Sequence, residues 1–236
     1  MYQRSARIYD VLYTGTHIID FAAQAESLHS LIATRNRAAR TLLDVACGTG
    51  QHLARLRRWY DVEGLDISRD MLMIARERLG GDVPLGLADM RTFDLGRTFD
   101  AVTCLFSSIG YLDDVGQLRR TMQRFAAHLN PGGVLVVDGW VRPDAWKDDT
   151  RRAPDYADDG TTAVARLVVN TRRGAITQLD MHHLVHAGDS VEYFAEKHRM
   201  RLFATGEYLD AATAAGLSAE ILTDYMPDRD RIVAVK

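Results

Sequence analysis

Cysteine is scarce in this sequence: among 236 residues there are two, Cys47 and Cys104. Neither belongs to a Cys-x-x-Cys pair or has a histidine at the spacing of a zinc site, which argues against the common zinc-binding motifs. Both lie in apolar stretches near the ends of predicted strands. We therefore expect two buried, unpaired thiols in a protein of the reducing cytoplasm.

An excess of positive charge is also missing. The formal net charge is -3 and the arginines are spread along the chain, so composition argues against binding to nucleic acid or to an anionic membrane surface. No window approaches the roughly 18 apolar residues that a membrane span needs. The first ten residues mix charged and polar side chains, unlike a secretory signal. The length suffices for one α/β domain with an additional lobe.

The most informative stretch of the chain is Leu42–Gly50. Two leucines followed by Asp44 predict the end of a buried parallel strand. Gly48 and Gly50 let the backbone approach a ligand closely, and we expect a helix to start at Thr49 or Gly50 with its free N–H groups facing the same point. A glycine turn of purely structural use is the alternative.

Two related loops differ from this one. A dinucleotide fingerprint has a third glycine where this chain has Leu53, and a Walker loop has Gly-Lys-Ser/Thr where Gln51 and His52 follow Gly50. The remaining pattern, an aspartate at a strand end with Gly-x-Gly starting four residues later, is typical of class I S-adenosylmethionine (SAM) methyltransferases.

Apolar runs and helical stripes alternate through the first 140 residues. Such alternation predicts a doubly wound parallel sheet, in which ligands bind beyond the carboxyl ends of the strands. The expected strands are 41–45, 62–68, 83–88, 99–106 and 134–137, and the main expected helices are 18–32, 71–79 and 118–129. Polar residues stand at the strand ends, so we expect them to converge: Asp44, Asp66, Asp89, Ser107 and Asp138.

Asp66 lies sixteen residues after Gly50, about where a carboxylate is expected to accept hydrogen bonds from the two hydroxyls of a ribose. A plain helix-capping acid is the alternative, and either Ser68 or Asp70 can cap the helix that follows. In this fold the next strand end meets an adenine, with Asp89 accepting from its exocyclic amine and Met90 lying on the ring.

After Trp140 the pattern changes. A polar loop over 143–159 is followed by strict alternation over 161–170, 175–186 and 190–203, with Gly174 and Gly188 at the turns. This indicates an antiparallel meander inserted into the main sheet as a lobe. A last helix over 209–215 and an edge hairpin over 219–223 and 231–235 complete the chain. We therefore divide it into a SAM-binding core with an N-terminal helical segment (1–140), a β insertion for substrate or dimer contacts (141–204) and a terminal part that completes the core (205–236).

Several motifs together resemble the nucleotide-aminosugar N,N-dimethyltransferases, which finish sugars such as desosamine, mycaminose and forosamine. The most discriminating are Phe-Ser-Ser-Ile-Gly-Tyr-Leu at 106–112 and Leu-Phe-x-x-x-x-Tyr at 202–208. The resemblance covers nearly the whole chain. Two stretches depart from it: Asp138–Pro143 replaces the family's Glu-Pro-Trp-Trp-Phe-Pro, and Asp228–Ile232 replaces its Gly-Arg-Gly-Leu-Phe.

The resemblance implies an α/β, Rossmann-like class I methyltransferase with an inserted antiparallel β lobe. It implies SAM as cofactor, S-adenosylhomocysteine as product, and single or double methylation of the amino group of a TDP-linked deoxy-aminosugar in antibiotic biosynthesis. A homodimer is expected from the resemblance alone. The alternatives are an O- or N-methyltransferase acting on a non-sugar acceptor and a non-catalytic SAM-binding protein.

Transfer of a methyl group from a sulfonium to an amine needs a neutral nitrogen, correct approach and little else. By resemblance, Tyr9 and Tyr111 orient the amine, although Tyr9 also fits a place in the core. His182 and His186 share one strand face but have no third ligand in register, so we expect no metal.

The expected contacts fall into two groups. The cofactor contacts are Asp44, Ala46, Gly48, Gly50, His52, Asp66, Ile67, Met71, Asp89, Met90, Phe106 and Ser107. The substrate contacts are Tyr13, Ser108, Trp140, Arg142, Arg166, His182, Arg229 and Arg231, with either Arg229 or Arg231 near the nucleotide phosphates.

Overall fold

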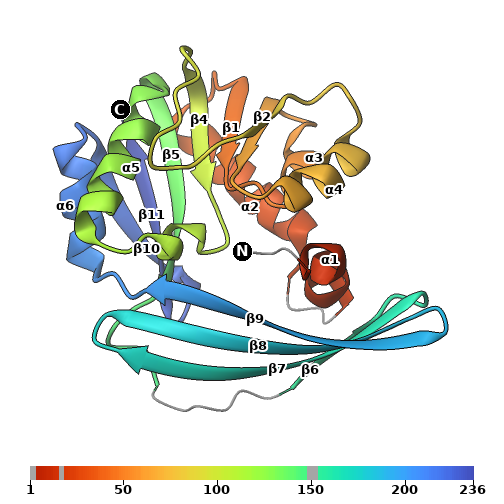
Figure 1. Ribbon diagram of the computed structural model, residues 1–236. Coiled ribbons are helices and arrows are strands. Elements are labelled where there is room, and N and C mark those ends of the chain that lie inside the picture. The colour runs from red at the N-terminus through yellow and green to blue at the C-terminus, as the bar shows by residue number, and fades with distance from the viewer. Residues whose placement is uncertain (1–3, 16–18, 148–153) are drawn as a thin grey trace.

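The computed structural model describes residues 4–15, 19–147 and 154–236, and these form two β-sheets with helices around the larger one (Figure 1). The larger sheet has seven strands in the order β10-β11-β5-β4-β1-β2-β3, and the smaller one, sheet B, has four strands in the order β6-β7-β8-β9. Within the described segments, no helix combines the length and apolar character required to span a bilayer.

The five parallel strands of the main sheet confirm the predicted doubly wound architecture. They are β1 (Thr41–Val45), β2 (Asp61–Asp66), β3 (Leu85–Leu87), β4 (Phe99–Cys104) and β5 (Leu129–Val141). The chain ends in the antiparallel hairpin of β10 (Ser218–Met226) and β11 (Arg229–Val235), with β11 paired to β5. The predicted edge hairpin is therefore present, and the parallel strands leave their carboxyl ends together on one side.

Successive side chains of the buried strands enter two separate cores, as the two-residue period of a strand requires. Leu42 packs with α2 (Phe21–Arg35), α3 (Leu53–Leu56) and α4 (Arg69–Leu79), whereas Leu43 packs on the opposite face with α5 (Val115–Ala127) and α6 (Thr205–Ala214). Both faces of the sheet are covered in this way.

Two helix starts differ from expectation. Ile18, where we expected the first long helix to begin, lies outside the described residues. The helix after the glycine loop begins at Leu53 rather than at Thr49 or Gly50 and is one turn long. Ser68 is the cap of α4, because its side chain accepts from the Met71 N–H.

The predicted meander forms sheet B, which is a separate sheet and not an insertion into the main one. Its strands are β6 (Asp155–Asp158), β7 (Thr162–Arg173), β8 (Ile176–Ala187) and β9 (Ser190–Arg201). β6 falls within the segment expected to be a loop, where it pairs with β7. Along β7 and β8 buried and exposed residues alternate, so one face of sheet B packs against the protein and the other faces outward.

Helix α1 (Ala6–Gly15) lies between the two sheets (Figure 1). Its residues Ile8, Val11 and Leu12 pack on the inner face of sheet B, against side chains that include Val164 and Phe194. This packing turns the adjacent side of the helix, with Tyr9 and Tyr13, toward the carboxyl ends of the main sheet.

Candidate functional site

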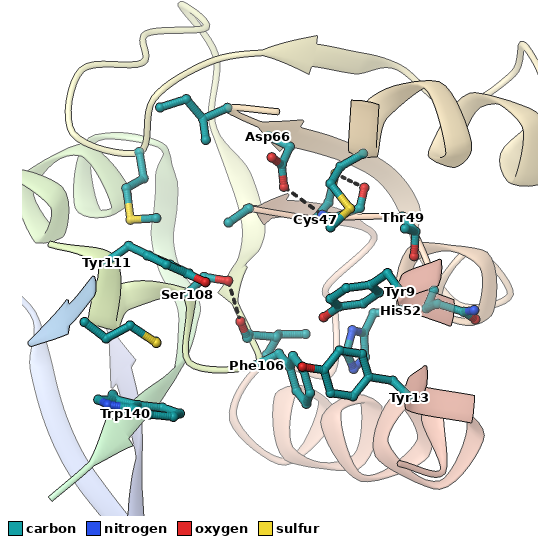
Figure 2. A pocket seen from close by; sticks show the side chains of 18 of the residues that line it. Tyr9, Tyr13, Cys47, Thr49, His52, Asp66, Phe106, Ser108, Tyr111 and Trp140 are labelled. Carbon is teal, nitrogen blue, oxygen red and sulfur yellow. Dashed lines mark hydrogen bonds between the residues drawn. The ribbon is translucent and has the colours of Figure 1, made fainter. Parts of the chain in front are cut away.

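A cavity of about 630 Å³ lies between the carboxyl ends of the parallel strands, helix α1 and the inner face of sheet B. Figure 2 shows Asp66 and Cys47 along one side, Tyr9, Tyr13 and His52 along another, and Tyr111 and Trp140 across from these tyrosines. Sheet B contributes apolar side chains, including Val168, Leu179, Met181 and Met200. The cavity is therefore polar where the main sheet ends and largely apolar near the lobe.

The glycine loop is held open toward the cavity by Asp66. Gly48 has φ +57°, and a Cβ built on it would meet no heavy atom within 4 Å, so space lies directly beside its backbone. The Asp66 carboxylate accepts from the Gly48 N–H at 2.8 Å and from the Ser68 N–H at 2.7 Å. Burial raises the pKa of Asp66, while these backbone hydrogen bonds oppose the shift.

Asp44 is buried at the end of β1 and accepts a hydrogen bond from the Thr103 hydroxyl at 2.7 Å. Burial raises the pKa of Asp44 to about 7, against the Thr103 hydrogen bond and with help from the charges of Asp66 and Asp138. A cationic group in the cavity is therefore expected to favour the ionised form of this carboxyl.

Asp89 lines the cavity at the end of the third strand, but its carboxylate is paired with Arg91. The two side chains lie 2.5 Å apart at their closest oxygen and nitrogen, and Arg91 also donates its backbone N–H. These hydrogen bonds lower the pKa of Asp89. A ligand amine at this carboxylate would have to share it with the guanidinium.

A strained turn follows β4. Phe106 and Ser107 have φ values of 56° and 62°, in the left-handed region that non-glycine residues seldom occupy. The Phe106 N–H donates to Asp138 at 3.1 Å, and Asp138 in turn accepts from Arg231 at 2.7 Å. The turn aims the Phe106 ring at Tyr9 and Tyr13, with centroid distances of 6.4 and 5.0 Å.

The two tyrosines expected to orient the acceptor both line the cavity. Tyr9 comes from α1, and Tyr111 comes from the one-turn helix η1 (Ser108–Tyr111) that follows the strained turn. The Tyr111 hydroxyl lies 2.7 Å from Nδ1 of His198 on β9.

Helix α1 is tied to the glycine loop by Asp10, a contact that the sequence analysis missed. The Asp10 carboxylate accepts from the Thr49 hydroxyl at 2.8 Å and from the Gln51 amide at 2.9 Å, and it pairs with Arg78 of α4. A single aspartate in an amphipathic helix gives no signal in sequence for partners about 40 residues away. Through these contacts the segment carrying Tyr9 is joined to the loop carrying Gly48.

Most of the expected contact residues line the cavity. From the expected cofactor set these are Asp44, Ala46, Gly48, His52, Asp66, Ile67, Met71, Asp89, Met90 and Phe106. From the expected substrate set they are Tyr13, Ser108, Trp140, Arg166 and Arg229. Trp140 both lines the cavity and packs under sheet B, donating to the Thr177 hydroxyl at 3.3 Å, with Arg229 over its ring at 4.7 Å.

Two expected cofactor contacts do not line the cavity, and the reason is packing. Gly50 faces α4, where an added Cβ would lie 2.9 Å from Leu79 Cδ1, so its role is close packing. Ser107 is buried, donating to the Gly139 carbonyl at 2.7 Å and accepting from Arg229 at 3.0 Å.

Three expected substrate contacts also lie elsewhere. Arg142 donates to the Pro227 carbonyl and lies 3.5 Å from Asp230, and Arg231 is buried against Asp138. His182 is on the outer face of sheet B, where it lies 2.7 Å from the Tyr193 hydroxyl. Arg229 is therefore the arginine of the last strand that reaches the cavity.

Both cysteines are free and buried, as predicted. Within the described residues, no group of three or more His, Cys, Asp or Glu side chains is arranged to hold a metal ion. Burial raises the pKa of the Cys47 thiol well above its usual value, so this cavity residue is a neutral, apolar neighbour for a ligand.

The chain is similar to known proteins in both sequence and structure. Residues 42–133 match the family model described as a methyltransferase domain. The chain is 42% identical, over 98% of its length and 97% of the relative's, to a dTDP-3-amino-3,4,6-trideoxy-alpha-D-glucopyranose N,N-dimethyltransferase of Streptomyces venezuelae.

Solved structures agree over the whole chain. The crystal structure of Streptomyces venezuelae DesVI superposes with a TM-score of 0.92 at 40% identity, covering 98% of this chain and 97% of that one. SAM-bound CalS10, an amino pentose methyltransferase from Micromonospora echinaspora, gives a TM-score of 0.87 at 36% identity, covering 97% and 96%. The structural similarity therefore extends over nearly the whole chain.

Proposed function

Because the chain belongs to the SAM-dependent dTDP-aminosugar N,N-dimethyltransferases, we propose that its cavity binds SAM where the main sheet ends and the aminosugar beside sheet B. The observation that carries this assignment is that Asp66, Gly48, Tyr9 and Tyr111 line one cavity. The first two fit a nucleoside, and the second two fit an amine.

The residues present fit SAM. Asp66 offers carboxylate oxygens beside the open side of Gly48, which suits the paired hydroxyls of a ribose. Asp44 offers a carboxyl whose ionised form a cation favours, and Met90 and Ile67 offer apolar surface for a base. SAM supplies a methyl group that its sulfonium has already activated, so this protein's residues have mainly to bind, orient and exclude water.

The positions of the tyrosines and of Arg229 indicate where the aminosugar binds. Tyr9 and Tyr111 come from opposite walls (Figure 2) and are placed to hydrogen-bond a sugar amine between them. Arg166 is already bound to Asp155 and to the Tyr13 hydroxyl. Arg229 lies over Trp140 at the cavity wall, donates to the Ser107 hydroxyl and lies 3.7 Å from Asp228. Its guanidinium is less tightly paired than that of Arg166, so it is the better partner for a diphosphate, which a guanidinium can grip with two N–H groups.

The test is incubation of the purified protein with SAM and dTDP-linked 3-amino or 4-amino deoxysugars, followed by mass spectrometry. We expect one or two methyl groups to be added to at least one of these sugars. Calorimetry with S-adenosylhomocysteine should show binding in the same preparation. Binding without methylation of any aminosugar would overturn the assignment of the acceptor and favour another acceptor or a non-catalytic role.

We further propose that the protein is a homodimer formed through the outer face of sheet B. Apolar side chains on this face are exposed on neighbouring strands, with Leu184 at 52% and Tyr193 at 58%. Leu184 is paired with both Ala165 and Tyr193 in the sheet register, so the apolar surface is continuous. A second copy related by two-fold symmetry would present the same apolar surface and cover it.

The two buried free thiols fit a cytoplasmic location, which we also propose.

Changing Leu184 to Glu is expected to produce a monomer, because the variant places charges in the apolar interface. Light scattering after size-exclusion chromatography measures the mass directly. Met73→Glu is the matched control, since Met73 is 58% exposed on α4, away from sheet B. Equal masses for Leu184→Glu and the unaltered protein would refute this interface.

A further inference from the structure

Behind Tyr111, away from the cavity, two residues of β9 form a chain of polar contacts. His198 is 2% exposed, and its Nδ1 lies 2.7 Å from the Tyr111 hydroxyl oxygen. Its other ring nitrogen, Nε2, lies 3.8 Å from Oε2 of Glu196. Tyr111, His198 and Glu196 therefore follow one another from the cavity into the inner face of sheet B.

Glu196 is held as a carboxylate. It accepts from the Arg4 N–H at 2.8 Å and the Ser5 N–H at 3.3 Å, just before α1, and it also accepts from the Ser5 hydroxyl. Burial by itself would raise the pKa of Glu196, but the neighbouring His198 imidazole and hydrogen bonds from Ser5 and Arg4 lower it to about 2. An ionised carboxylate only accepts hydrogen bonds.

This charge decides where the imidazole proton of His198 resides. A carboxylate beside Nε2 favours the tautomer with its proton on Nε2, as in histidines whose second nitrogen is oriented by a carboxylate. Nδ1 then has a lone pair, and the Tyr111 O–H donates to it across the 2.7 Å contact. With its proton engaged there, the Tyr111 oxygen offers lone pairs to a group in the cavity.

We propose that Glu196 and His198 are positioning residues that keep Tyr111 a hydrogen-bond acceptor toward the substrate amine. The proposal builds on the function assigned above. A nucleophilic amine needs its lone pair directed at the methyl carbon. A tyrosine that donated its O–H to the nitrogen would occupy that lone pair, whereas one that accepts an amine N–H orients the nitrogen and leaves the lone pair available.

The tautomer can be read without any turnover. In protein labelled with ¹⁵N-histidine, the nitrogen resonances of His198 are assigned by their disappearance in His198→Gln. We expect Nδ1 to be the unprotonated nitrogen in the unaltered protein. In Glu196→Gln the new amide can donate to Nε2, so we expect the proton to move to Nδ1. A proton on Nδ1 in the unaltered protein would overturn the proposal, whatever the acceptor is.

Kinetics supply the second readout. In Glu196→Gln, His198 donates from Nδ1 and Tyr111 turns its O–H toward the cavity. We therefore expect kcat to fall about tenfold, the effect of one misdirected hydrogen bond. The Kd for SAM should be unchanged. Ser5→Ala is the matched control, because it removes a contact to Glu196 and leaves the carboxylate in place. It should keep kcat within about twofold, a change below 1 kcal/mol.

A double-mutant cycle separates this role from simple support of the fold. Tyr111→Phe alone should also cost about tenfold in kcat, but in the Glu196→Gln background it should cost nothing further, because the hydroxyl is then of no help. Two losses that multiply would refute the proposal, as would a loss in Ser5→Ala equal to that in Glu196→Gln. If the unaltered protein methylates no aminosugar, the function assigned above fails, and the nitrogen resonances still decide the tautomer.

Discussion

Asp66→Ala is expected to weaken SAM binding by at least about a hundredfold. The carboxylate lies at the end of β2 and lines the cavity beside Gly48, where we place the two ribose hydroxyls. A hydrogen bond to a charged group contributes about 1.5–3 kcal/mol, so losing two of them costs about 3 kcal/mol or more. The alanine variant also releases the Gly48 and Ser68 N–H groups, which adds to the loss. Titration calorimetry measures the Kd directly.

Asp61→Asn is the control for Asp66→Ala. Asp61 begins the same strand at its opposite end, and its side chain is exposed, so the change removes one carboxylate from β2 without touching the cavity. Its Kd for SAM should stay within about threefold of the original, a difference below 1 kcal/mol. Circular dichroism would establish that both variants are folded. A folded Asp66→Ala protein that binds SAM as Asp61→Asn does would remove Asp66 from the cofactor site.

The part of this site nearest the main sheet could be predicted from sequence because its determinants are local. Apolar runs ending in an acid define buried parallel strands, and the geometry of such sheets brings their carboxyl ends together. Asp44, Asp66 and Asp89 accordingly line one cavity, although they lie on three different strands or strand ends. Ser107 does not line the cavity, because the left-handed turn at Phe106 and Ser107 directs its side chain inward to the Gly139 carbonyl. No local pattern in the sequence signals that turn.

The part of the site formed by sheet B was harder to predict than the part at the main sheet. Alternation of apolar and polar residues along a strand does not reveal which face lies inside. The resemblance implies His182 as a substrate contact, yet the inner face of sheet B carries its neighbour His183, paired with Arg166 across the strands. A shift of one residue exchanges the two faces of a strand. For the same reason the roles of Glu196 and His198 were not predicted. Their partners, Ser5 and Tyr111, are brought to them by the packing of α1 and η1 on the sheet.

Arg231→Met is expected to lower the free energy of unfolding by about 3–5 kcal/mol, the usual result of removing one partner from a buried ion pair. The Arg231 and Asp138 side chains are 5% and 3% exposed and lie 2.7 Å apart. Without the guanidinium, Asp138 is a buried charge with the Phe106 N–H as its remaining partner from this network. For a chain of this size, the loss corresponds to a midpoint of thermal unfolding lower by about 10 °C.

Arg58→Met provides the comparison with an exposed ion pair, since the Arg58 and Glu26 side chains lie 2.8 Å apart and are 49% and 64% exposed. That change should cost under about 1 kcal/mol. Adding Asp138→Asn to Arg231→Met should restore part of the stability, because the amide oxygen still accepts from Phe106 and no buried charge is left alone. Equal losses in Arg231→Met and Arg58→Met, measured by denaturant unfolding, would mean that the buried pair does not hold the turn on which Phe106 reaches the cavity.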